Sequence, residues 1–248
     1  MTTYGLIGYP LVHSFSRKCF TEKFAAEGLD AEYLNFEIPS IGQLPSILQA
    51  HPDLRGLNVT IPYKEQVISY LDALDEGARA IGAVNVIRIS HSDGRTVLKG
   101  YNADVIGFMD SLHPLLRPHH RQALVLGTGG ASKAITYGLR QLGITPTLVS
   151  RTPRKGMLAY SDLDEEVMRK YLVIVNCTPV GTYPKVDACP DIPYRLLTPD
   201  HLLYDLVYNP EKTLFLQRGE AQGAQIKNGL EMLHRQAEAS WDFWHIQD

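Results

Sequence analysis

Residues 123–132 decide the fold: they read Ala123-Leu124-Val125-Leu126-Gly127-Thr128-Gly129-Gly130-Ala131-Ser132. The four apolar residues predict a strand, and the glycines that follow open a predicted helix, which is the context of a dinucleotide-binding loop. Gly127 permits the tight turn, Gly129 lets the backbone approach a pyrophosphate, and the small Ala131 and Ser132 allow close helix packing. We therefore predict that residues 127–132 bind a dinucleotide. The alternative interpretation is a plain strand-to-helix turn, in which glycine is also common.

The segment after the next predicted strand indicates which dinucleotide binds. That strand covers Pro146 to Ser150, and an NAD site usually places an acidic side chain near its end, on the ribose 2'-hydroxyl. Here the sequence has no carboxylate and instead offers hydroxyls and cations that suit a 2'-phosphate: Ser150, Arg151, Thr152, Arg154 and Lys155. We therefore predict NADP rather than NAD. Arg151 is the strongest candidate, because Arg154 and Lys155 could equally be solvated surface residues.

Strand and helix signals alternate on both sides of this unit. Strands are predicted at Tyr4–Gly8, Leu34–Ile38, Gly56–Pro62, Ala123–Leu126, Pro146–Ser150, Leu172–Asn176, Leu202–Leu206 and Ala224–Lys227, with a hairpin of Val84–Ile89 and Thr96–Lys99. Helices are predicted at Ser16–Ala26, Ser40–Ala50, Lys64–Leu71, Asp75–Ile81, Asp104–Leu116, Gly130–Leu142, Glu211–Gln222 and Gly229–Trp244. The pattern predicts an α/β protein with parallel sheets covered by helices. Arg117 to Gln122, rich in proline, histidine and arginine, reads as a crossing between two domains.

Length, composition and charge narrow the class of partner. The chain has 248 residues, an apolar content of 44% and a formal charge of −3, so no net charge draws it to nucleic acid or an anionic membrane. No secretory signal and no apolar run of about 20 residues is present. Three cysteines at unrelated spacings and scattered histidines predict neither a disulfide framework nor a metal site. We expect a cytoplasmic protein that acts on a small molecule.

Several polar residues stand at predicted strand ends and loop starts in the first half of the chain. Each has an ordinary structural interpretation when taken singly. Ser14 and Ser16 suit helix N-caps, Asn85 a turn, and Lys64 a solvated first turn of a helix. Asp104 likewise suits an N-cap. Local spacing alone therefore selects none of them as catalytic.

Together these residues belong to motifs that resemble, in order, the signatures of the shikimate dehydrogenase family. In the first half the motifs are His13-Ser14-Phe15-Ser16, Asn58-Val59-Thr60-Ile61-Pro62-Tyr63-Lys64, Gly82-Ala83-Val84-Asn85 and Asn102-Ala103-Asp104. In the second half, the glycine loop and Ser150-Arg151-Thr152 are followed by Asn176-Cys177-Thr178-Pro179-Val180-Gly181, Tyr204-Asp205-Leu206-Val207-Tyr208, and Asn228-Gly229-Leu230-Glu231-Met232-Leu233 with Gln236. The resemblance covers nearly the whole chain.

The resemblance implies a two-domain protein: an α/β substrate domain with a mostly parallel sheet, residues 1–103 plus 229–248, and a Rossmann-like NADP domain, residues 104–228. It implies that Ser14, Ser16 and Tyr208 hold the carboxylate of shikimate, with Thr60 close by, and that Asn58, Asn85 and Gln236 contact ring hydroxyls. It adds Asn176, Thr178 and Gly229 to the cofactor site. Lys64 and Asp104 fall at the positions of the catalytic pair. The expected reaction is the reversible NADP-dependent reduction of 3-dehydroshikimate to shikimate, by a monomer or a homodimer.

Three alternatives stay open at this stage. A quinate or quinate/shikimate dehydrogenase would use the same lysine and aspartate on a saturated ring. A ligand-sensing module on the same fold would need the pocket but not the acid-base pair. A folate-type dehydrogenase of related architecture would not need the carboxylate clamp of Ser14 and Ser16. The sequence also departs from the family pattern at Arg17, Tyr101, Ala103 and Thr182, and the stretch from Lys155 to Asp164 is too short for the usual helix and strand.

Overall fold

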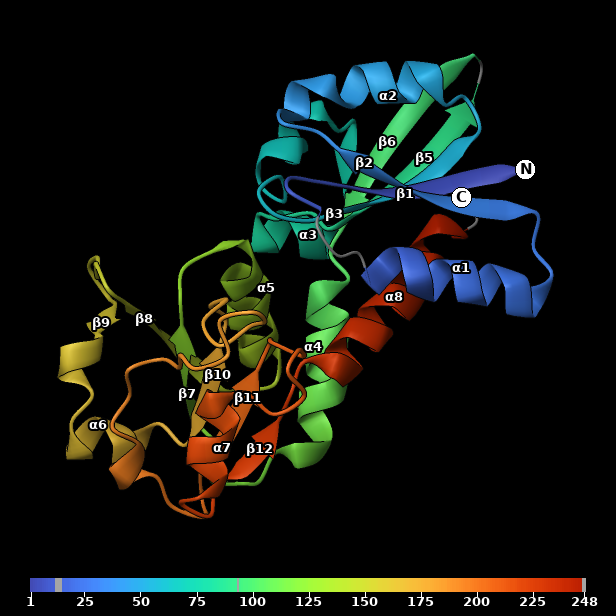
Figure 1. The fold of residues 1–248 in the computed structure, drawn as a ribbon. Helices are drawn as coiled ribbons and strands as arrows, with labels where there is room; N and C mark the ends of the chain where they lie inside the picture. The colour runs from blue at the N-terminus through green and yellow to red at the C-terminus, as the bar shows by residue number, and fades with distance from the viewer. Residues whose placement is uncertain (12–14, 93, 247–248) are drawn as a thin grey trace. The chain divides into compact units, whose positions relative to one another are not determined.

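The computed structural model describes residues 1–11, 15–92 and 94–246 (Figure 1). The chain divides into two compact units, Met1–Ala103 with Gln236–Asp248 (unit 1) and Asp104–Arg235 (unit 2). Each unit contains a six-stranded sheet. Among the described residues, no helix has the length and apolar character needed to cross a membrane.

Unit 1 is built on a mixed sheet with the strand order β2-β1-β3-β5-β6-β4. Its elements are β1 (Thr2–Gly8), α1 (Phe15–Glu27), β2 (Ala31–Glu37), η1 (Ile41–Gln43), α2 (Leu44–Ala50), β3 (Leu54–Val59), η2 (Gln66–Tyr70), β4 (Ala73–Leu74), α3 (Glu76–Ile81), β5 (Val86–Ser92), β6 (Arg95–Tyr101) and the end of α8 (Leu230–Trp244). Strands β1, β2 and β3 are parallel, whereas β5 runs antiparallel to both β3 and β6. The end of β3, the start of β5 and the end of β6 therefore meet at one edge of the sheet, because Val86 pairs with both Asn58 and Tyr101.

Helices cover both faces of this sheet (Figure 1). On one face, apolar side chains of η1 and α2, among them Ile41 and Leu44, pack with Leu57 and Ile87 in a continuous core. On the other face, rings of α1 and α8 pack on β1, with the Tyr4 ring stacked on Trp244 at a centroid distance of 4.8 Å. Burial of these large apolar surfaces supplies most of the stabilisation of such a layered unit.

Unit 2 is built on an entirely parallel sheet with the order β12-β11-β10-β7-β8-β9. Its elements are α4 (Asp104–Leu112), η3 (His113–Leu115), β7 (Gln122–Leu126), α5 (Gly130–Gln141), β8 (Thr145–Ser150), β9 (Leu158–Ala159), η4 (Tyr160–Asp162), α6 (Glu165–Lys170), β10 (Val173–Asn176), η5 (Tyr194–Leu196), β11 (Leu202–Asp205), α7 (Leu214–Glu220), β12 (Gln225–Lys227) and the start of α8. Counted from β7, the order is 6-5-4-1-2-3, which is the doubly wound arrangement of dinucleotide-binding domains. The predicted α/β fold with a Rossmann-like second part is confirmed.

Two separate apolar layers sandwich this parallel sheet. Side chains of α4 and α5, such as Phe108 and Ile135, pack with Val125 and Tyr204 on one face. Side chains of α6 and α7, such as Met168 and Phe215, pack on the opposite face. A sheet buried on both sides needs nearly continuous apolar strands, and the run Ala123 to Leu126 is fully buried.

Some predicted elements differ from those observed, for local reasons. The helix expected over Lys64 to Leu71 is instead the 3-10 helix η2, because the Lys64 carbonyl accepts a hydrogen bond from the Val84 N–H at 2.7 Å and is not used within a helix. The helix expected to reach Leu116 ends at Leu112, since Pro114 cannot donate to an α-helical carbonyl. Helix α6 and the short β9 were not predicted.

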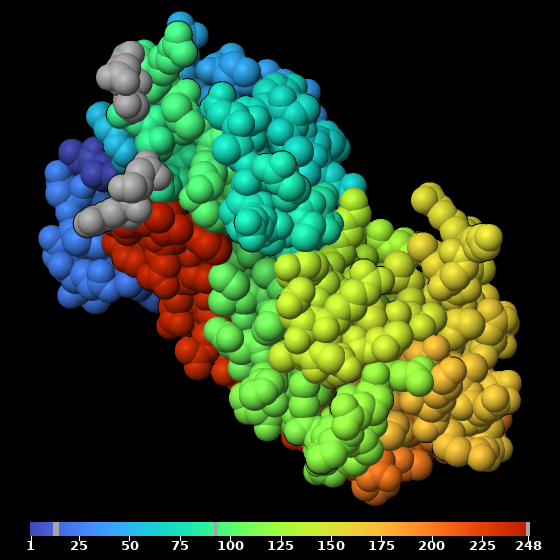
Figure 2. Space-filling model, turned by 180° about the vertical axis from the view of Figure 1, so that it is seen from behind, coloured from blue at the N-terminus to red at the C-terminus, as the bar shows by residue number. Residues whose placement is uncertain are grey.

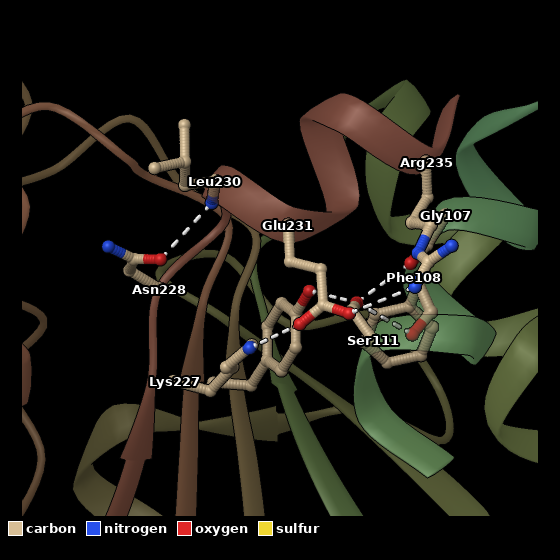
Figure 3. A network of polar contacts seen from close by, with 9 residues as sticks. Gly107, Phe108, Ser111, Lys227, Asn228, Leu230, Glu231 and Arg235 are labelled. Carbon is tan, nitrogen blue, oxygen red and sulfur yellow. Dashed lines mark hydrogen bonds and ion pairs between the residues drawn. The ribbon is translucent and has the colours of Figure 1, made fainter. Parts of the chain in front are cut away.

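A polar network anchors the first turns of α8 within unit 2 (Figure 3). Lys227 Nζ at the end of β12 donates to Glu231 Oε2 at 2.5 Å, and Arg235 Nη2 lies 3.7 Å from Glu231 Oε1. These two cations hold the pKa of the Glu231 carboxyl below its ordinary value. Residues 229–235 thus group with unit 2, seven residues beyond the boundary expected from the sequence.

Candidate active site

The glycine loop after β7 has the conformation that a dinucleotide requires. Gly127 has φ +103°, and a Cβ there would lie 2.9 Å from Thr178 Cγ2, so only glycine fits. Gly129 is the N-cap of α5, with no side-chain cap, and a Cβ there would meet no atom within 4 Å. Thr128 and Gly129 are exposed, whereas Ser132 is buried and its Oγ donates to the Gly129 carbonyl at 2.6 Å. The helix N-terminus therefore presents backbone N–H groups at a place where the surface is open, which suits a pyrophosphate.

The loop lies where the strand order reverses. Strands β7 and β10 are neighbours whose chain connections run in opposite directions, and ligands of doubly wound folds bind at the carboxyl ends of such strands. Gly127 follows β7, and Thr178 follows β10. A Cβ added to Gly127 would lie 2.9 Å from Thr178 Cγ2, so the two loops lie side by side at this point.

The segment after β8 is exposed and basic. Arg151, Thr152, Arg154 and Lys155 are all exposed, and the segment projects from the surface of unit 2 (yellow in Figure 2). Ser150 is half-buried, and its Oγ accepts a hydrogen bond from the Thr152 N–H at 3.2 Å. The shortened stretch that follows holds only the two-residue β9 and the turn η4. A 2'-phosphate at this position would meet cations and no carboxylate from residues 150–155.

Asn176 is fully buried and makes its hydrogen bonds inside the protein. Its Nδ2 donates to Asp205 Oδ1 at 2.9 Å, and its Oδ1 accepts from the Thr178 N–H at 3.0 Å and the Thr178 Oγ1 at 2.6 Å. Thr178 itself is half-buried. The Asn176 side chain therefore shapes the loop at the end of β10, and Thr178 is the member of the pair nearer the surface.

Gly229 is required by packing. A Cβ at this position would lie 2.2 Å from the Leu206 carbonyl oxygen. The backbone around it is also bonded, with the Gly229 N–H donating to the Val207 carbonyl at 3.2 Å and the Gly229 carbonyl accepting from Leu233 at 3.0 Å. This glycine lets the start of α8 approach the loop after β11.

Replacing Gly229 by alanine should destabilise unit 2. Overpacking against a backbone atom costs about 1–3 kcal/mol, and we expect the thermal midpoint to fall by several degrees, measured by circular dichroism. Gly77→Ala is the control, since Gly77 lies in α3 and a Cβ there meets nothing closer than 3.4 Å. A Gly229→Ala protein that melts like the wild type would contradict this role.

A buried polar cluster in unit 1 holds the amides expected to contact ring hydroxyls. Asn58 Nδ2 donates to Ser240 Oγ at 2.9 Å, and Asn58 Oδ1 accepts from the Tyr33 hydroxyl at 2.8 Å. Asn85 Nδ2 donates to Gln236 Oε1 at 3.2 Å. Ser240 lies one turn after Gln236, whose carbonyl accepts from Ser240 Oγ at 2.7 Å. The structure therefore brings Asn58, Asn85 and Gln236 together.

Lys64 and Asp104 are both tied to the segment that leads into β5. The Lys64 carbonyl accepts from the Val84 N–H, and the N–H of Ala103, the residue before Asp104, donates to Asn85 Oδ1 at 2.6 Å. Lys64 is half-buried, and Asp104, the first residue of α4, is 6% exposed. A charged group that is mostly out of water interacts more strongly with a nearby charge than an exposed one does.

The residues expected to hold the substrate carboxylate belong to different elements. Ser14 lies outside the described residues. Ser16 is the second residue of α1 and is half-buried, and Thr60 follows β3 with its N–H bonded to the Ile7 carbonyl at 2.9 Å. Tyr208, in unit 2, is 37% exposed, and partial burial raises the pKa of its hydroxyl. Its hydroxyl is therefore neutral at physiological pH and can donate to an anion.

Three polar residues of these networks were not expected from the sequence: Tyr33, Ser240 and Asp205. Ser240 had one signal, because its spacing of four from Gln236 puts both on the same face of a helix. Tyr33 pairs with Tyr4 in neighbouring strands and gave no signal apart from its hydroxyl. Asp205 lies in the motif of residues 204–208, for which the resemblance implied a role only at Tyr208.

The chain is similar in sequence and in structure to shikimate dehydrogenases. A family model described as the shikimate dehydrogenase substrate binding domain matches residues 6–87. A shikimate dehydrogenase (NADP(+)) of Desulforamulus reducens is 34% identical, and the alignment covers 97% of this chain and 88% of that protein. A chorismate mutase/shikimate 5-dehydrogenase fusion protein from Clostridium acetobutylicum superposes with a TM-score of 0.87 at 35% identity, covering 99% of this chain and 91% of the other. The shikimate 5-dehydrogenase of Thermus thermophilus, solved with NADP(H) and shikimate, gives 0.85 at 32% identity, covering 99% and 94%.

Proposed function

The chain belongs to the shikimate dehydrogenase family, and we infer from this that it is an oxidoreductase that catalyses the reversible NADP-dependent reduction of 3-dehydroshikimate to shikimate. This reaction belongs to the biosynthesis of aromatic amino acids. The partners of the protein are the small-molecule substrate and NADP. The observation that carries the proposal beyond family membership is the combination of an open glycine loop in unit 2 with a buried amide cluster in unit 1. The cytoplasmic location and the monomeric or homodimeric state stay predictions.

The residues of unit 2 fit NADP. The pyrophosphate is held by the loop of residues 127–132 and the N-terminus of α5, where Gly129 leaves open space. Arg151 and Thr152 receive the 2'-phosphate, with Ser150 and Arg154 beside them, and Thr178 lines the same edge. When bound, NADP supplies or accepts the hydride, and the protein supplies orientation and proton transfer.

The residues of unit 1 fit a ring that carries several hydroxyls. Asn58, Asn85 and Gln236 present amide groups that can both donate and accept hydrogen bonds, which is what a polyol needs. Ser14, Ser16 and Thr60 supply hydroxyls for the carboxylate, as does Tyr208 from unit 2. The edge at which β3 ends and β5 begins places the amides beside the backbone that carries Lys64.

Lys64 and Asp104 perform the proton transfer. Negative charge develops on the substrate oxygen when the ketone is reduced, and the Lys64 ammonium stabilises this charge and donates a proton to the oxygen. In the reverse direction Lys64 accepts the hydroxyl proton. The Asp104 carboxylate holds the ammonium in position and accepts a hydrogen bond from the same hydroxyl.

Replacing Arg151 by alanine tests the cofactor assignment. Loss of a charge-assisted hydrogen bond to the 2'-phosphate costs about 1.5–3 kcal/mol, so the KM for NADP should rise by about 10-fold to 100-fold while the KM for NAD changes little. Initial rates with both cofactors measure this. The control is Arg169→Ala, because Arg169 is exposed and bonds only Glu165 at 3.1 Å among the contacts described. An unchanged ratio of the two KM values would refute the role of Arg151.

A further inference from the structure

Unit 2 contains the same histidine turn twice, at the amino-terminal ends of two strands. Residues 117–120 lead into β7, and residues 198–201 lead into β11. In each turn the second residue is proline and the fourth is histidine. The histidine N–H donates to the carbonyl of the first residue at 3.0 Å in both turns. His120 is 4% exposed and His201 is 2% exposed, so both side chains are buried.

The two imidazole rings make the same pair of backbone contacts. In both turns Nδ1 accepts a hydrogen bond from the N–H of the first residue at 3.0 Å. The Thr198 hydroxyl also lies 3.0 Å from His201 Nδ1 and can donate to it. The other ring nitrogen, Nε2, lies 3.0 Å from a carbonyl oxygen, that of Asp200 for His120 and that of Met168 for His201.

These backbone partners fix the protonation state of both rings. A backbone N–H can only donate and a carbonyl oxygen can only accept, so Nδ1 must carry a lone pair and Nε2 must carry the proton. A neutral imidazole satisfies both contacts at once. Protonation of Nδ1 would place one N–H against another, donor against donor, in either turn.

The contacts join three segments that precede neighbouring strands. His120 belongs to the turn before β7 and bonds the turn before β11, whereas His201 belongs to that second turn and bonds Met168 in α6, the helix before β10. Strands β11, β10 and β7 are adjacent and parallel. Their amino ends therefore meet at one edge of the sheet, opposite to the edge that carries the glycine loop. The two histidines link the entries of all three strands.

We propose that His120 and His201 form an acid-sensitive clasp at this edge, closed while both rings are neutral and opened when either ring takes up a proton. A protonated ring must move away from the N–H that it faces, and the turn that holds the ring then separates from its neighbour. The clasp belongs to the fold of unit 2. It does not depend on the identity of the cofactor or of the substrate.

The surroundings of the rings disfavour the protonated form. Burial lowers the pKa of His120 and of His201 below the ordinary value of 6.5, against the opposing effect of the carbonyls that accept from Nε2. Among the described residues, Asp200 favours protonation of both rings, whereas His119 and Arg117 disfavour that of His120. The unfolded chain thus binds these protons more tightly than the folded unit. The stabilisation is complete above about pH 6.5 and is lost as pH falls below this value, toward the lower pKa of the folded state.

Nuclear magnetic resonance of the ¹⁵N-labelled protein tests the clasp directly. At pH 7.5 both rings should show the signals of a neutral imidazole with its proton on Nε2. Both should titrate with midpoints below the ordinary value of 6.5. A proton on Nδ1 of either ring at pH 7.5, or a midpoint at or above 6.5, would overturn the proposal.

Hydrogen exchange measures the opening at the two N–H groups that the rings accept from. After correction for intrinsic exchange, the Arg117 and Thr198 amides should lose protection by up to about 10-fold per pH unit below pH 6.5, because each opening takes up one proton. Gly143 is the control, since it precedes β8 in the same unit and its N–H donates to the Arg140 carbonyl at 3.0 Å. Equal loss at all three amides would indicate a general effect of acid and contradict the clasp.

The double variant His120→Asn with His201→Asn removes the titration. The asparagine Oδ1 takes a place close to that of Nδ1 and can accept from the same N–H, but it is not protonated in this range. The thermal midpoint at pH 7.5 should be lower than that of the wild type, because the bonds from Nε2 are lost. Its further fall between pH 7.5 and 5.5 should be smaller than in the wild type by several degrees.

Two comparisons make this result specific. His113→Asn removes an exposed imidazole of η3, and its midpoint should fall with pH as the wild-type midpoint does. Asp205, whose pKa is raised by burial to about 6, titrates in all of these proteins, so its contribution cancels between variant and wild type. A double variant with the pH dependence of the wild type would overturn the proposal. If the double variant does not fold, the resonance and exchange measurements on the wild type decide.

Discussion

Replacing Lys64 by alanine is expected to lower kcat by at least about 100-fold, the usual contribution of one general acid-base group. The Kd for NADPH should not change, because the cofactor is held by residues of unit 2 while Lys64 follows β3 in unit 1. Steady-state kinetics with shikimate and fluorescence titration with NADPH measure the two quantities separately. Lys64→Arg should not recover the activity, since a guanidinium keeps the charge but cannot be deprotonated to act as a base.

The control for Lys64 is Lys212→Ala. Lys212 is an exposed lysine whose ammonium pairs with the Glu220 carboxylate at 2.8 Å, and an exposed pair of this kind contributes little to the free energy of unfolding. Its loss should leave kcat at the wild-type value. Near wild-type turnover of the Lys64→Ala protein would show that another group transfers the proton.

Gly127→Ala is expected to raise the KM for NADP by about 10-fold to 100-fold. A side chain at a positive φ of this kind costs about 1–3 kcal/mol, and the added methyl group must also displace Thr178, whose Cγ2 would be 2.9 Å away. The loop can relieve the backbone strain and the clash with Thr178 only by leaving the conformation that exposes its N–H groups to the pyrophosphate. Initial-rate kinetics at saturating shikimate measure the effect.

Gly143→Ala separates backbone strain from the effect on the cofactor. Gly143 also has a positive φ, +74°, but it follows α5 at its far end, and a Cβ there meets no atom within 4 Å. The substitution should lower the thermal midpoint while leaving the KM for NADP unchanged. If Gly143→Ala and Gly127→Ala raised this KM equally, the glycine loop would have no specific role.

Features set by neighbouring residues could be predicted from the sequence. The strand and glycines of residues 123–130 give the βα turn of unit 2, and their signal is local because turn geometry depends on φ at Gly127. The preference for NADP could likewise be predicted from Arg151 and the residues adjacent to it. The 3-10 helix η2 could not be predicted, because its cause is the hydrogen bond between Lys64 and Val84, twenty positions apart.

The polar networks could not be predicted, because each joins distant parts of the chain. Asn58 and Ser240 are 182 positions apart, and Asn176 and Asp205 are 29 apart. Nothing in the spacing of these residues distinguishes a bonded amide from a solvated one. The assignment of Lys64 and Asp104 came from motifs in register, and the structure adds the backbone contacts through Val84 and Asn85.

The most direct measurement is the absorbance of the reduced nicotinamide during incubation of the protein with shikimate or quinate and either NADP or NAD. We predict rapid formation of NADPH with shikimate and NADP, and slower reaction with quinate or with NAD. Faster oxidation of quinate would reassign the substrate, and faster reaction with NAD would refute the role given to the basic segment after β8. Thermal stabilisation by shikimate without any NADPH formation would contradict the central claim and indicate a ligand sensor instead.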